Sequence, residues 1–187
     1  MNDQEVGGPG DAEQLRRAAR IRYILCDVDG VLTDGRLQWT EDGKELKSFH
    51  VRDGLGIKLW QGAGHGFGIL TARSSPIVTR RAAELGIAMV RQGCEEKLPA
   101  AQEIVATLSL TPQHVCYIGD DLPDIPVMRW VGLAVTVADG ADEAKRAAHW
   151  ITQRAGGCGA VREAIEWLLT VQGRWPELLP PQGSRVE

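Results

Sequence analysis

Two aspartates, Asp27 and Asp29, stand one residue apart where the apolar run "IRYILC" ends. Residues i and i+2 of an extended strand point to the same side, so these carboxylates would repel each other unless a positive charge lay between them. Oxygen ligands with room for water are what Mg²⁺ requires, and a carboxylate can itself attack phosphorus to form an aspartyl-phosphate. The pair therefore indicates either metal-assisted phosphoryl transfer or an ordinary turn, since Asp-Gly is common in turns.

Other polar side chains stand where later apolar runs end. Thr71 follows "GFGIL", Asp120 and Asp121 follow "HVCYIG", and Lys97 opens a helical segment between them. Ligands of open α/β sheets gather outside the carboxyl ends of the strands, so we expect these groups to converge on one site. There Asp27 would attack phosphorus and Asp29 would transfer the proton. Lys97 and Mg²⁺ would neutralise the phosphoryl charge, and Thr71 would donate a hydrogen bond to it.

Apolar runs alternate with helix-like segments along the chain, which predicts an α/β fold with a mostly parallel central sheet. The Asp42-Gly43 pair predicts a β-hairpin between 36–40 and 45–51. We expect helices near 54–61, 75–86, 96–110, 124–132, 141–148 and 159–175. The expected organisation is a disordered leader at 1–20, a single domain at 21–175 and a flexible tail at 176–187.

Composition excludes several classes of protein. The net charge is −4 with no large basic block, which argues against a nucleic-acid partner. No apolar run approaches the roughly 18 residues needed to cross a membrane, and the N-terminus lacks the apolar stretch of a signal peptide. Cys26, Cys94, Cys116 and Cys158 are widely spaced without C-x-x-C, so we expect reduced thiols in a cytoplasmic protein rather than disulfides or metal ligands.

The ordered motifs resemble those of the haloacid dehalogenase-like superfamily of phosphotransferases. "DVDGVLTDG", "ILTAR", Lys97 and "GDDLPD" look like its first to fourth motifs. Across about 22–173, "FHVRDGLGIKL", "TARSSPIV", "YIGDDLPDIPVM" and "RAGGCGAVRE" are similar to the 3-deoxy-D-manno-octulosonate 8-phosphate (KDO 8-phosphate) phosphatase family. This resemblance implies a three-layer Rossmann-like fold and a Mg²⁺-dependent phosphomonoesterase. Such an enzyme would release KDO and inorganic phosphate in lipopolysaccharide precursor synthesis.

The resemblance also implies roles for single residues. Asp27 is expected to be nucleophile and Mg²⁺ ligand, Asp29 acid/base with its backbone carbonyl on the metal, and Asp120 the last protein ligand. Thr71 and Lys97 would bind the phosphoryl group. Asp121 and Asp124 would orient Lys97 and metal-bound waters rather than bind the ion. The expected substrate-binding residues are Asp29, His50, Val51, Arg52, Asp53, Gly54, Lys58, Arg73, Arg81 and Lys97.

Arg73 bears on the choice of substrate, because a guanidinium can bind a sugar carboxylate in bidentate fashion. The related phosphatases of nine-carbon keto-deoxy sugars, which remain an alternative, tend to carry an acidic residue there.

Three residues depart from the family pattern: Ala72 replaces a glycine, His50 an asparagine and Cys158 an arginine. Lys58 and Arg81 have a second interpretation as solvated helix charges. A different class, a signalling module phosphorylated on aspartate, is disfavoured by the D-x-D-G-V-x-T-D arrangement and the late "GDD".

The spacing of the motifs leaves no room for a cap domain. Only the hairpin and one helix separate Asp29 from Thr71, and only a helix and a strand separate Thr71 from Lys97. Phosphoryl transfer benefits from exclusion of water, and the resemblance implies that capless relatives achieve this as homotetramers. The hairpin region 36–51, with Trp39 and Phe49, is the expected contact surface. The alternative is that these aromatic side chains pack on their own domain.

Overall fold

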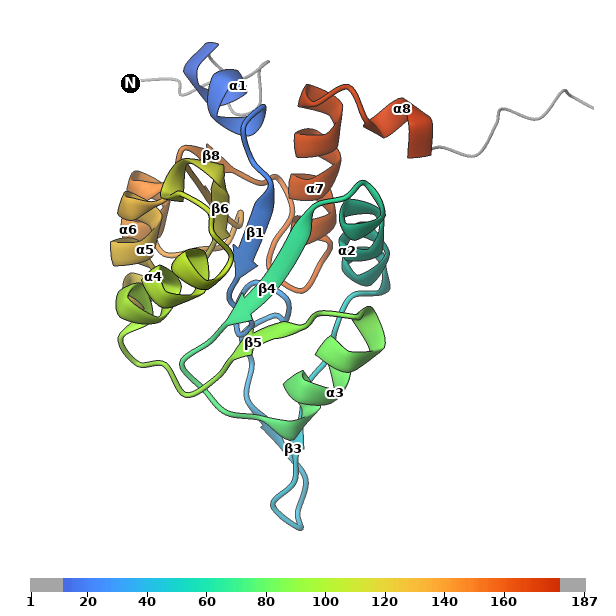
Figure 1. Cartoon of the computed structure of the whole chain (residues 1–187). Helices are drawn as coiled ribbons and strands as arrows, with labels where there is room; N and C mark the ends of the chain where they lie inside the picture. The colour runs from blue at the N-terminus through green and yellow to red at the C-terminus, as the bar shows by residue number, and fades with distance from the viewer. Residues whose placement is uncertain (1–11, 179–187) are drawn as a thin grey trace, which may run out of the picture.

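The computed structural model describes residues 12–178 and contains a six-stranded parallel sheet in the order β5-β4-β1-β6-β7-β8 (Figure 1). A separate antiparallel pair is formed by β2 and β3. The strands are β1 (Tyr23–Cys26), β2 (Gln38–Trp39), β3 (Glu45–Leu46), β4 (Gly66–Leu70), β5 (Met89–Arg91), β6 (Val115–Ile118), β7 (Leu133–Thr136) and β8 (Trp150–Ile151). The α/β fold class with a mostly parallel sheet is therefore confirmed.

Helices cover both faces of this sheet, which gives three layers. Helices α2, α3 and α7 pack on one face and α4, α5 and α6 on the other (Figure 1). The helices are α1 (Ala12–Ala18), α2 (Val51–Gly62), α3 (Pro76–Leu85), α4 (Lys97–Thr107), α5 (Ile125–Trp130), α6 (Asp142–Ala147), α7 (Ala160–Val171) and α8 (Trp175–Leu178), with 3-10 turns η1 (Pro112–His114) and η2 (Leu122–Asp124).

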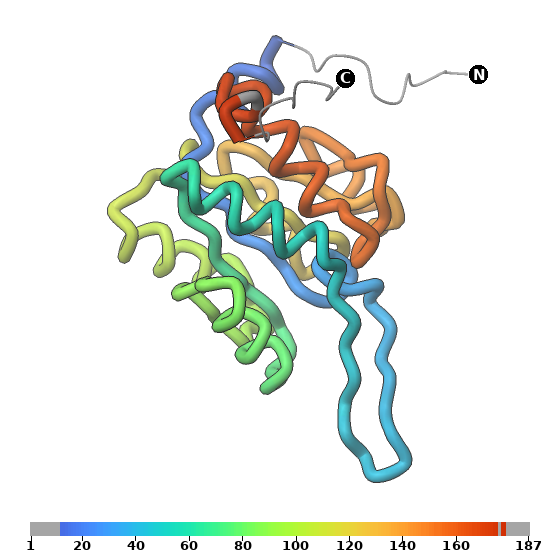
Figure 2. Tube along the Cα trace, turned by 90° about the vertical axis from the view of Figure 1, so that its right-hand side faces the viewer, coloured from blue at the N-terminus to red at the C-terminus, as the bar shows by residue number. Residues whose placement is uncertain are grey.

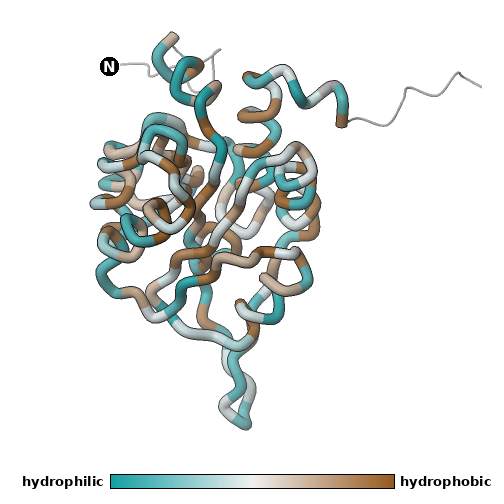
Figure 3. Tube along the Cα trace, in the orientation of Figure 1, coloured by the Kyte–Doolittle hydropathy of each residue, from teal (hydrophilic) through white to brown (hydrophobic). Residues whose placement is uncertain are grey.

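Alternation along the central strand builds two hydrophobic cores. Ile24 and Cys26 of β1 lie in the core beneath α2, α3 and α7, whereas Tyr23 and Leu25 lie in the core beneath α4, α5 and α6. All four residues are buried, because a parallel sheet covered on both faces has no solvated side. Figure 3 shows hydrophobic residues along the strands and alternating with hydrophilic residues along the helices. Burial of these two faces fixes where β1 ends, and thus where Asp27 stands.

The predicted hairpin is present and projects from the domain (Figure 2). Gln38 pairs with Leu46 and Trp39 with Glu45 in antiparallel register. Gly43 in the connecting turn has φ of +77°, a conformation that glycine adopts without steric cost. Only this hairpin lies between β1 and α2, and only α3 and β5 lie between β4 and α4. The prediction of a fold without a cap domain is thereby confirmed.

Part of the expected leader at 1–20 is helical in the structure. Helix α1 occupies part of it and is anchored to the domain, since Gln14 Nε2 donates to His149 O (2.6 Å) and Arg17 NH1 donates to Gly132 O (2.7 Å). The expected tail at 176–187 also overlaps a short helix, α8. The rest of the leader and of the tail, at 1–11 and 179–187, lies outside the described residues.

Two further elements differ from the sequence-based expectation. Helix α2 begins at Val51 rather than near Gly54, because His50 caps it: the Nδ1 atom accepts a hydrogen bond from Arg52 N at 3.2 Å. Strand β8, only two residues long, has too short an apolar run to be predicted. Of the four cysteines, Cys26 and Cys116 are buried, Cys94 is half-buried and Cys158 is exposed, and none forms a disulfide within 12–178. Within 12–178, no helix has both the length and the apolar character needed to cross a membrane.

Candidate active site

Three neighbouring strands end at one place in the sheet. Strand β1 has β4 on one side and β6 on the other, so the order of the strands reverses around it. Asp27 directly follows β1, Thr71 directly follows β4, and Asp120 stands two residues after β6. The carboxyl ends of such strands form the ligand-binding crevice of an open α/β sheet. The convergence predicted for these polar residues follows from this topology.

A buried charge cluster forms the floor of the site. Lys97, the first residue of α4 and 3% exposed, places its Nζ 2.8 Å from Asp27 Oδ2 and 2.6 Å from Asp124 Oδ1. Burial and the nearby Asp124 raise the pKa of Asp27 to about 6, although Lys97 opposes this rise. Burial alone would lower the pKa of Lys97, but the two carboxylates raise it above its usual value. Near neutral pH, Asp27 is therefore an ionised carboxylate beside a permanent positive charge.

Asp124 has no free oxygen lone pair directed at the site. Its Oδ1 accepts from Lys97 Nζ and from the buried Tyr117 hydroxyl, both at 2.6 Å. Its Oδ2 accepts from the backbone amides of Asp120 (2.9 Å) and Asp121 (3.2 Å). Asp124 thus orients Lys97, in agreement with the sequence-based expectation. Asp121 caps the η2 turn through Leu122 N. Sequence reasoning missed Tyr117, although a tyrosine in a buried strand signals a hydroxyl that needs a partner.

The carboxylates also fit a divalent cation. Oxygens of Asp27, Asp120 and Asp124 all lie within 4.8 Å of one another. Asp27 Oδ1 is buried and has no hydrogen-bond partner among residues 12–178, which is costly for a charged oxygen. Burial, together with the negative charges of Asp124 and Asp27, raises the pKa of Asp120 to about 8. Since Asp124 is fully hydrogen-bonded, Asp27 and Asp120 are the side chains able to hold the cation, and its charge would remove their mutual repulsion.

The close approach of two loops explains one glycine in the first motif. A Cβ atom at Gly30 would lie 2.1 Å from Asp120 Oδ2, so any other residue there would displace this carboxylate. Gly30 also has φ of +92°, which disfavours other residues independently of space. A Cβ atom at Gly156, in the "GGCG" segment, would lie 1.8 Å from Gly30 O. The segment before α7 therefore packs directly on the aspartate loop, while Cys158 within it is exposed.

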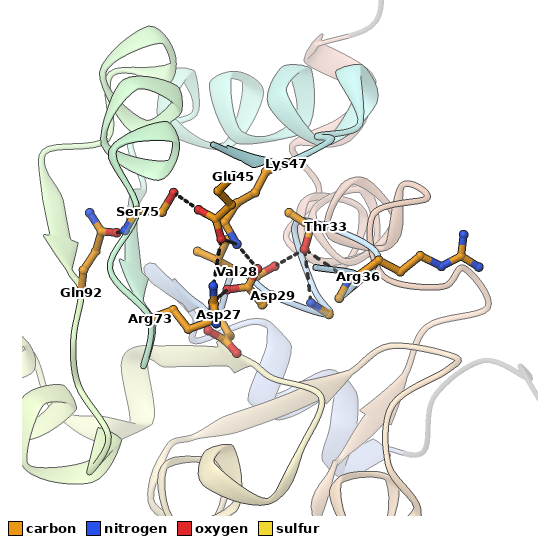
Figure 4. Close-up of polar contacts among 12 residues, drawn as sticks. Asp27, Val28, Asp29, Thr33, Arg36, Glu45, Lys47, Arg73, Ser75 and Gln92 are labelled. Carbon is orange, nitrogen blue, oxygen red and sulfur yellow. Dashed lines mark hydrogen bonds and ion pairs between the residues drawn. The ribbon is translucent and has the colours of Figure 1, made fainter. Parts of the chain in front are cut away.

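The second aspartate of the motif faces the hairpin (Figure 4). Asp29 Oδ1 forms an ion pair with Lys47 Nζ, and Asp29 Oδ2 lies 3.7 Å from Arg73 Nε. Glu45 Oε1 lies 3.0 Å from Arg73 NH2 and 3.5 Å from Lys47 Nζ. Arg73, predicted to bind substrate, thus lies beside Asp29. Glu45 and Lys47 were missed, because two charged residues on an exposed hairpin carry no sequence signal that separates them from solvated charges.

The remaining predicted substrate residues differ in exposure. Val51, Arg52 and Lys58 are exposed along α2. Asp53 is 2% exposed, and its Oδ1 accepts from Arg162 N at 2.8 Å, so it caps the N-terminus of α7 instead of facing solvent. Burial raises the pKa of Asp53.

Two other members of the set, Gly54 and Arg81, are explained by packing. A Cβ atom at Gly54 would lie 2.5 Å from Arg81 NH2, so the glycine makes room for that guanidinium. The Arg81 guanidinium carbon lies 5.7 Å from the centroid of the Phe49 ring. Phe49 packs against its own core, which is the alternative stated for it, whereas Trp39 of the hairpin is 58% exposed.

Comparisons with known proteins agree with this geometry. The sequence model of the haloacid dehalogenase-like hydrolase family matches residues 87–165. The chain is 44% identical to 3-deoxy-D-manno-octulosonate 8-phosphate phosphatase KdsC of Yersinia pestis, over 89% of each chain. It is 43% identical to KdsC of Escherichia coli K12, over 91% of this chain and 90% of that one.

A solved structure is also similar to this chain. It is the Moraxella catarrhalis 3-deoxy-D-manno-octulosonate 8-phosphate phosphatase in complex with magnesium, phosphate and KDO. It superimposes with a TM-score of 0.87 at 39% identity, covering 88% of this chain and 95% of that chain. With relatives of this identity and coverage, the chain belongs to the 3-deoxy-D-manno-octulosonate 8-phosphate phosphatase family of haloacid dehalogenase-like hydrolases.

Proposed function

We propose that this protein is a Mg²⁺-dependent phosphatase that hydrolyses KDO 8-phosphate to KDO and inorganic phosphate. The observation that carries the proposal is Asp27, a buried carboxylate with one oxygen paired to Lys97 and the other without a hydrogen-bond partner in the described part of the chain. Its relatives are named for this activity, and one of them was solved with magnesium, phosphate and KDO. A carboxylate so placed can serve as a nucleophile toward phosphorus.

In the proposed reaction, a carboxylate oxygen of Asp27 forms a bond to phosphorus and the bond from phosphorus to the sugar oxygen breaks. Asp29 donates a proton to the departing sugar oxygen. Water then attacks phosphorus, Asp29 takes its proton, and phosphate leaves with Asp27 regenerated. Lys97 and Thr71 bind the phosphoryl oxygens throughout. When bound at Asp27, Asp120 and the Asp29 carbonyl, Mg²⁺ supplies positive charge that offsets the charge of the phosphoryl group.

Substrate recognition is proposed for residues around this centre. Arg73 is well placed to bind the sugar carboxylate, because it lies beside Asp29 and keeps 41% of its side chain exposed. The exposed residues of α2 are proposed to contribute further contacts, together with His50 at its N-cap. The members of the predicted substrate set that are largely buried support the site through packing: Asp53, Gly54 and Arg81.

The assembly and location of the protein are further proposals. We propose a homotetramer in which the hairpin contacts another subunit. The exposed apolar side chains Leu37, Trp39 and Leu46 support this, because they would be covered in such an assembly. Mass determination in solution tests it, and a monomer at micromolar concentration would contradict it.

We propose that the protein acts in the cytoplasm, in line with its free thiols. Cell fractionation tests this location.

A phosphate-release assay tests the substrate. The purified chain with Mg²⁺ is given KDO 8-phosphate, the 9-phosphate of a nine-carbon keto-deoxy sugar acid, and a hexose 6-phosphate without a carboxylate. We expect the highest kcat/KM for KDO 8-phosphate, the substrate for which the relatives are named, and the lowest for the hexose 6-phosphate, which lacks the carboxylate that Arg73 would bind. A higher kcat/KM for the nine-carbon substrate would overturn the proposed substrate while leaving the phosphatase reaction in place.

A further inference from the structure

Lys47 is a buried ammonium group that the hairpin delivers to the active site (Figure 4). It directly follows β3, and its side chain is only 2% exposed. Lysine is almost never buried unless it is paired, because removing its charge from water is costly. Its partners are Asp29 Oδ1, with which it forms an ion pair, and Glu45 Oε1 at 3.5 Å. By contrast Lys44, at the hairpin turn, is 78% exposed and forms an ion pair with the exposed Asp42.

Glu45 fixes the position of this ammonium group. Its Oε2 accepts from the Ser75 hydroxyl at 2.7 Å, and its Oε1 accepts from Arg73 NH2 at 3.0 Å. Ser75 is itself held, since its backbone amide donates to Gln92 Oε1 at 2.7 Å. These contacts tie the returning arm of the hairpin to the segments after β4 and β5. Lys47 is therefore attached to the domain at a defined place despite lying on a projecting element.

The arrangement leaves one Asp29 oxygen for chemistry. Lys47 forms its hydrogen bond with Oδ1, whereas Oδ2 pairs with Arg73 Nε at 3.7 Å, beyond hydrogen-bond distance. A carboxylate held by one oxygen keeps its other oxygen in a fixed direction. That direction determines whether a proton reaches the departing sugar oxygen, since proton transfer requires hydrogen-bond contact.

We propose that Lys47 is a positioning residue for hydrolysis, which holds Asp29 by Oδ1 so that Oδ2 is the atom that exchanges the proton. This inference rests on the proposed function of Asp29 as acid/base. It makes the hairpin part of the reaction apparatus of its own subunit, in addition to the subunit contact proposed for it.

The test compares Lys47→Met, which keeps the stem and removes the charge, with the matched hairpin control Lys44→Met. For each, kcat/KM is measured on KDO 8-phosphate and on p-nitrophenyl phosphate, whose leaving group needs little protonation. We expect Lys47→Met to lower kcat/KM on the sugar phosphate by about 10- to 100-fold and on the aryl phosphate by less than about threefold. The loss on the sugar should lie mainly in kcat, Lys47→Arg should be less impaired than Lys47→Met, and Lys44→Met should match wild type.

A second comparison places the effect at Asp29. In an Asp29→Asn background, adding Lys47→Met should change kcat/KM on the sugar phosphate by less than about threefold, because a residue acting through Asp29 has nothing left to position. Equal losses on both substrates, or a full loss added to that of Asp29→Asn, would overturn the inference. If Lys47→Met does not fold, Glu45→Gln combined with Lys47→Met carries the same comparisons, since it leaves no uncompensated hairpin charge. A wild-type chain that prefers another sugar phosphate overturns the proposed substrate alone, and that sugar phosphate then replaces KDO 8-phosphate in the test.

Discussion

Asp29 illustrates how one side chain can be tested through its leaving group. Asp29→Asn removes the proton that the departing sugar oxygen needs, so kcat/KM for KDO 8-phosphate should fall by about 10²- to 10⁴-fold. With p-nitrophenyl phosphate the loss should be much smaller, because its leaving group departs without a proton. Steady-state phosphate release on both substrates measures the difference. Equal losses would assign Asp29 a different role.

Arg73 offers a separate prediction about substrate recognition. Arg73→Ala should raise KM for KDO 8-phosphate by about 10- to 100-fold, the loss of roughly one charge-assisted contact. The aryl phosphate, which has no carboxylate, should be little affected. Arg80→Ala is the control, because Arg80 lies on the neighbouring α3 and its side chain is 85% exposed. An unchanged KM for the sugar acid would remove Arg73 from the substrate site.

Among single residues, the sequence predicted the side chains expected to react or to bind phosphate better than the side chains that fix their positions. Asp27, Thr71 and Lys97 are recognisable because each stands at the end of an apolar run or at the start of a helix. Glu45 and Lys47 could not be recognised, since their burial depends on how the hairpin returns to the domain. The burial of Asp53 was equally hidden, because its partner Arg162 is 109 residues away in the sequence.

Helix α7 shows how a distant side chain can support a helix at the site. Asp53 Oδ1 accepts from Arg162 N, a donor in the first turn of α7 that has no partner within the helix. Asp53→Ala should therefore lower the free energy of unfolding by about 0.5 to 2 kcal/mol. Asp53→Asn, which keeps an acceptor oxygen, should lose less. Denaturant unfolding measures both. An unchanged stability with a raised KM would instead show that Asp53 contacts substrate.

The hairpin shows what can and cannot be predicted about an element. Its turn was predicted from Asp42-Gly43, and the positive φ of Gly43 is the reason that this pair is informative. The sequence predicted that α2 starts near Gly54, whereas it starts at Val51. The prediction was late because histidine is an uncommon N-cap, so His50 gave no signal. Helix α1 was missed because a single seven-residue helix beside a polar N-terminus has little periodicity to detect.

The fold brings several carboxylates together at the carboxyl ends of the central strands. This arrangement predicts that phosphate release depends on a cation. Chelation with EDTA should abolish phosphate release and Mg²⁺ should restore it. Ca²⁺ should support the reaction poorly, because its larger coordination number allows it to occupy the oxygens that Asp27 needs for attack. Full activity in buffer freed of divalent metals would contradict the proposed roles of Asp27 and Asp120.

The most direct measurement compares wild type with Asp27→Asn on KDO 8-phosphate in the presence of Mg²⁺, following KDO and phosphate together. Wild type should release the two products in equal amounts. Asp27→Asn should keep the fold, as judged by circular dichroism, and lose at least about a thousandfold in kcat, because an amide cannot replace the attacking carboxylate. No product from wild type, or more than about a hundredth of wild-type turnover in Asp27→Asn, would contradict the account.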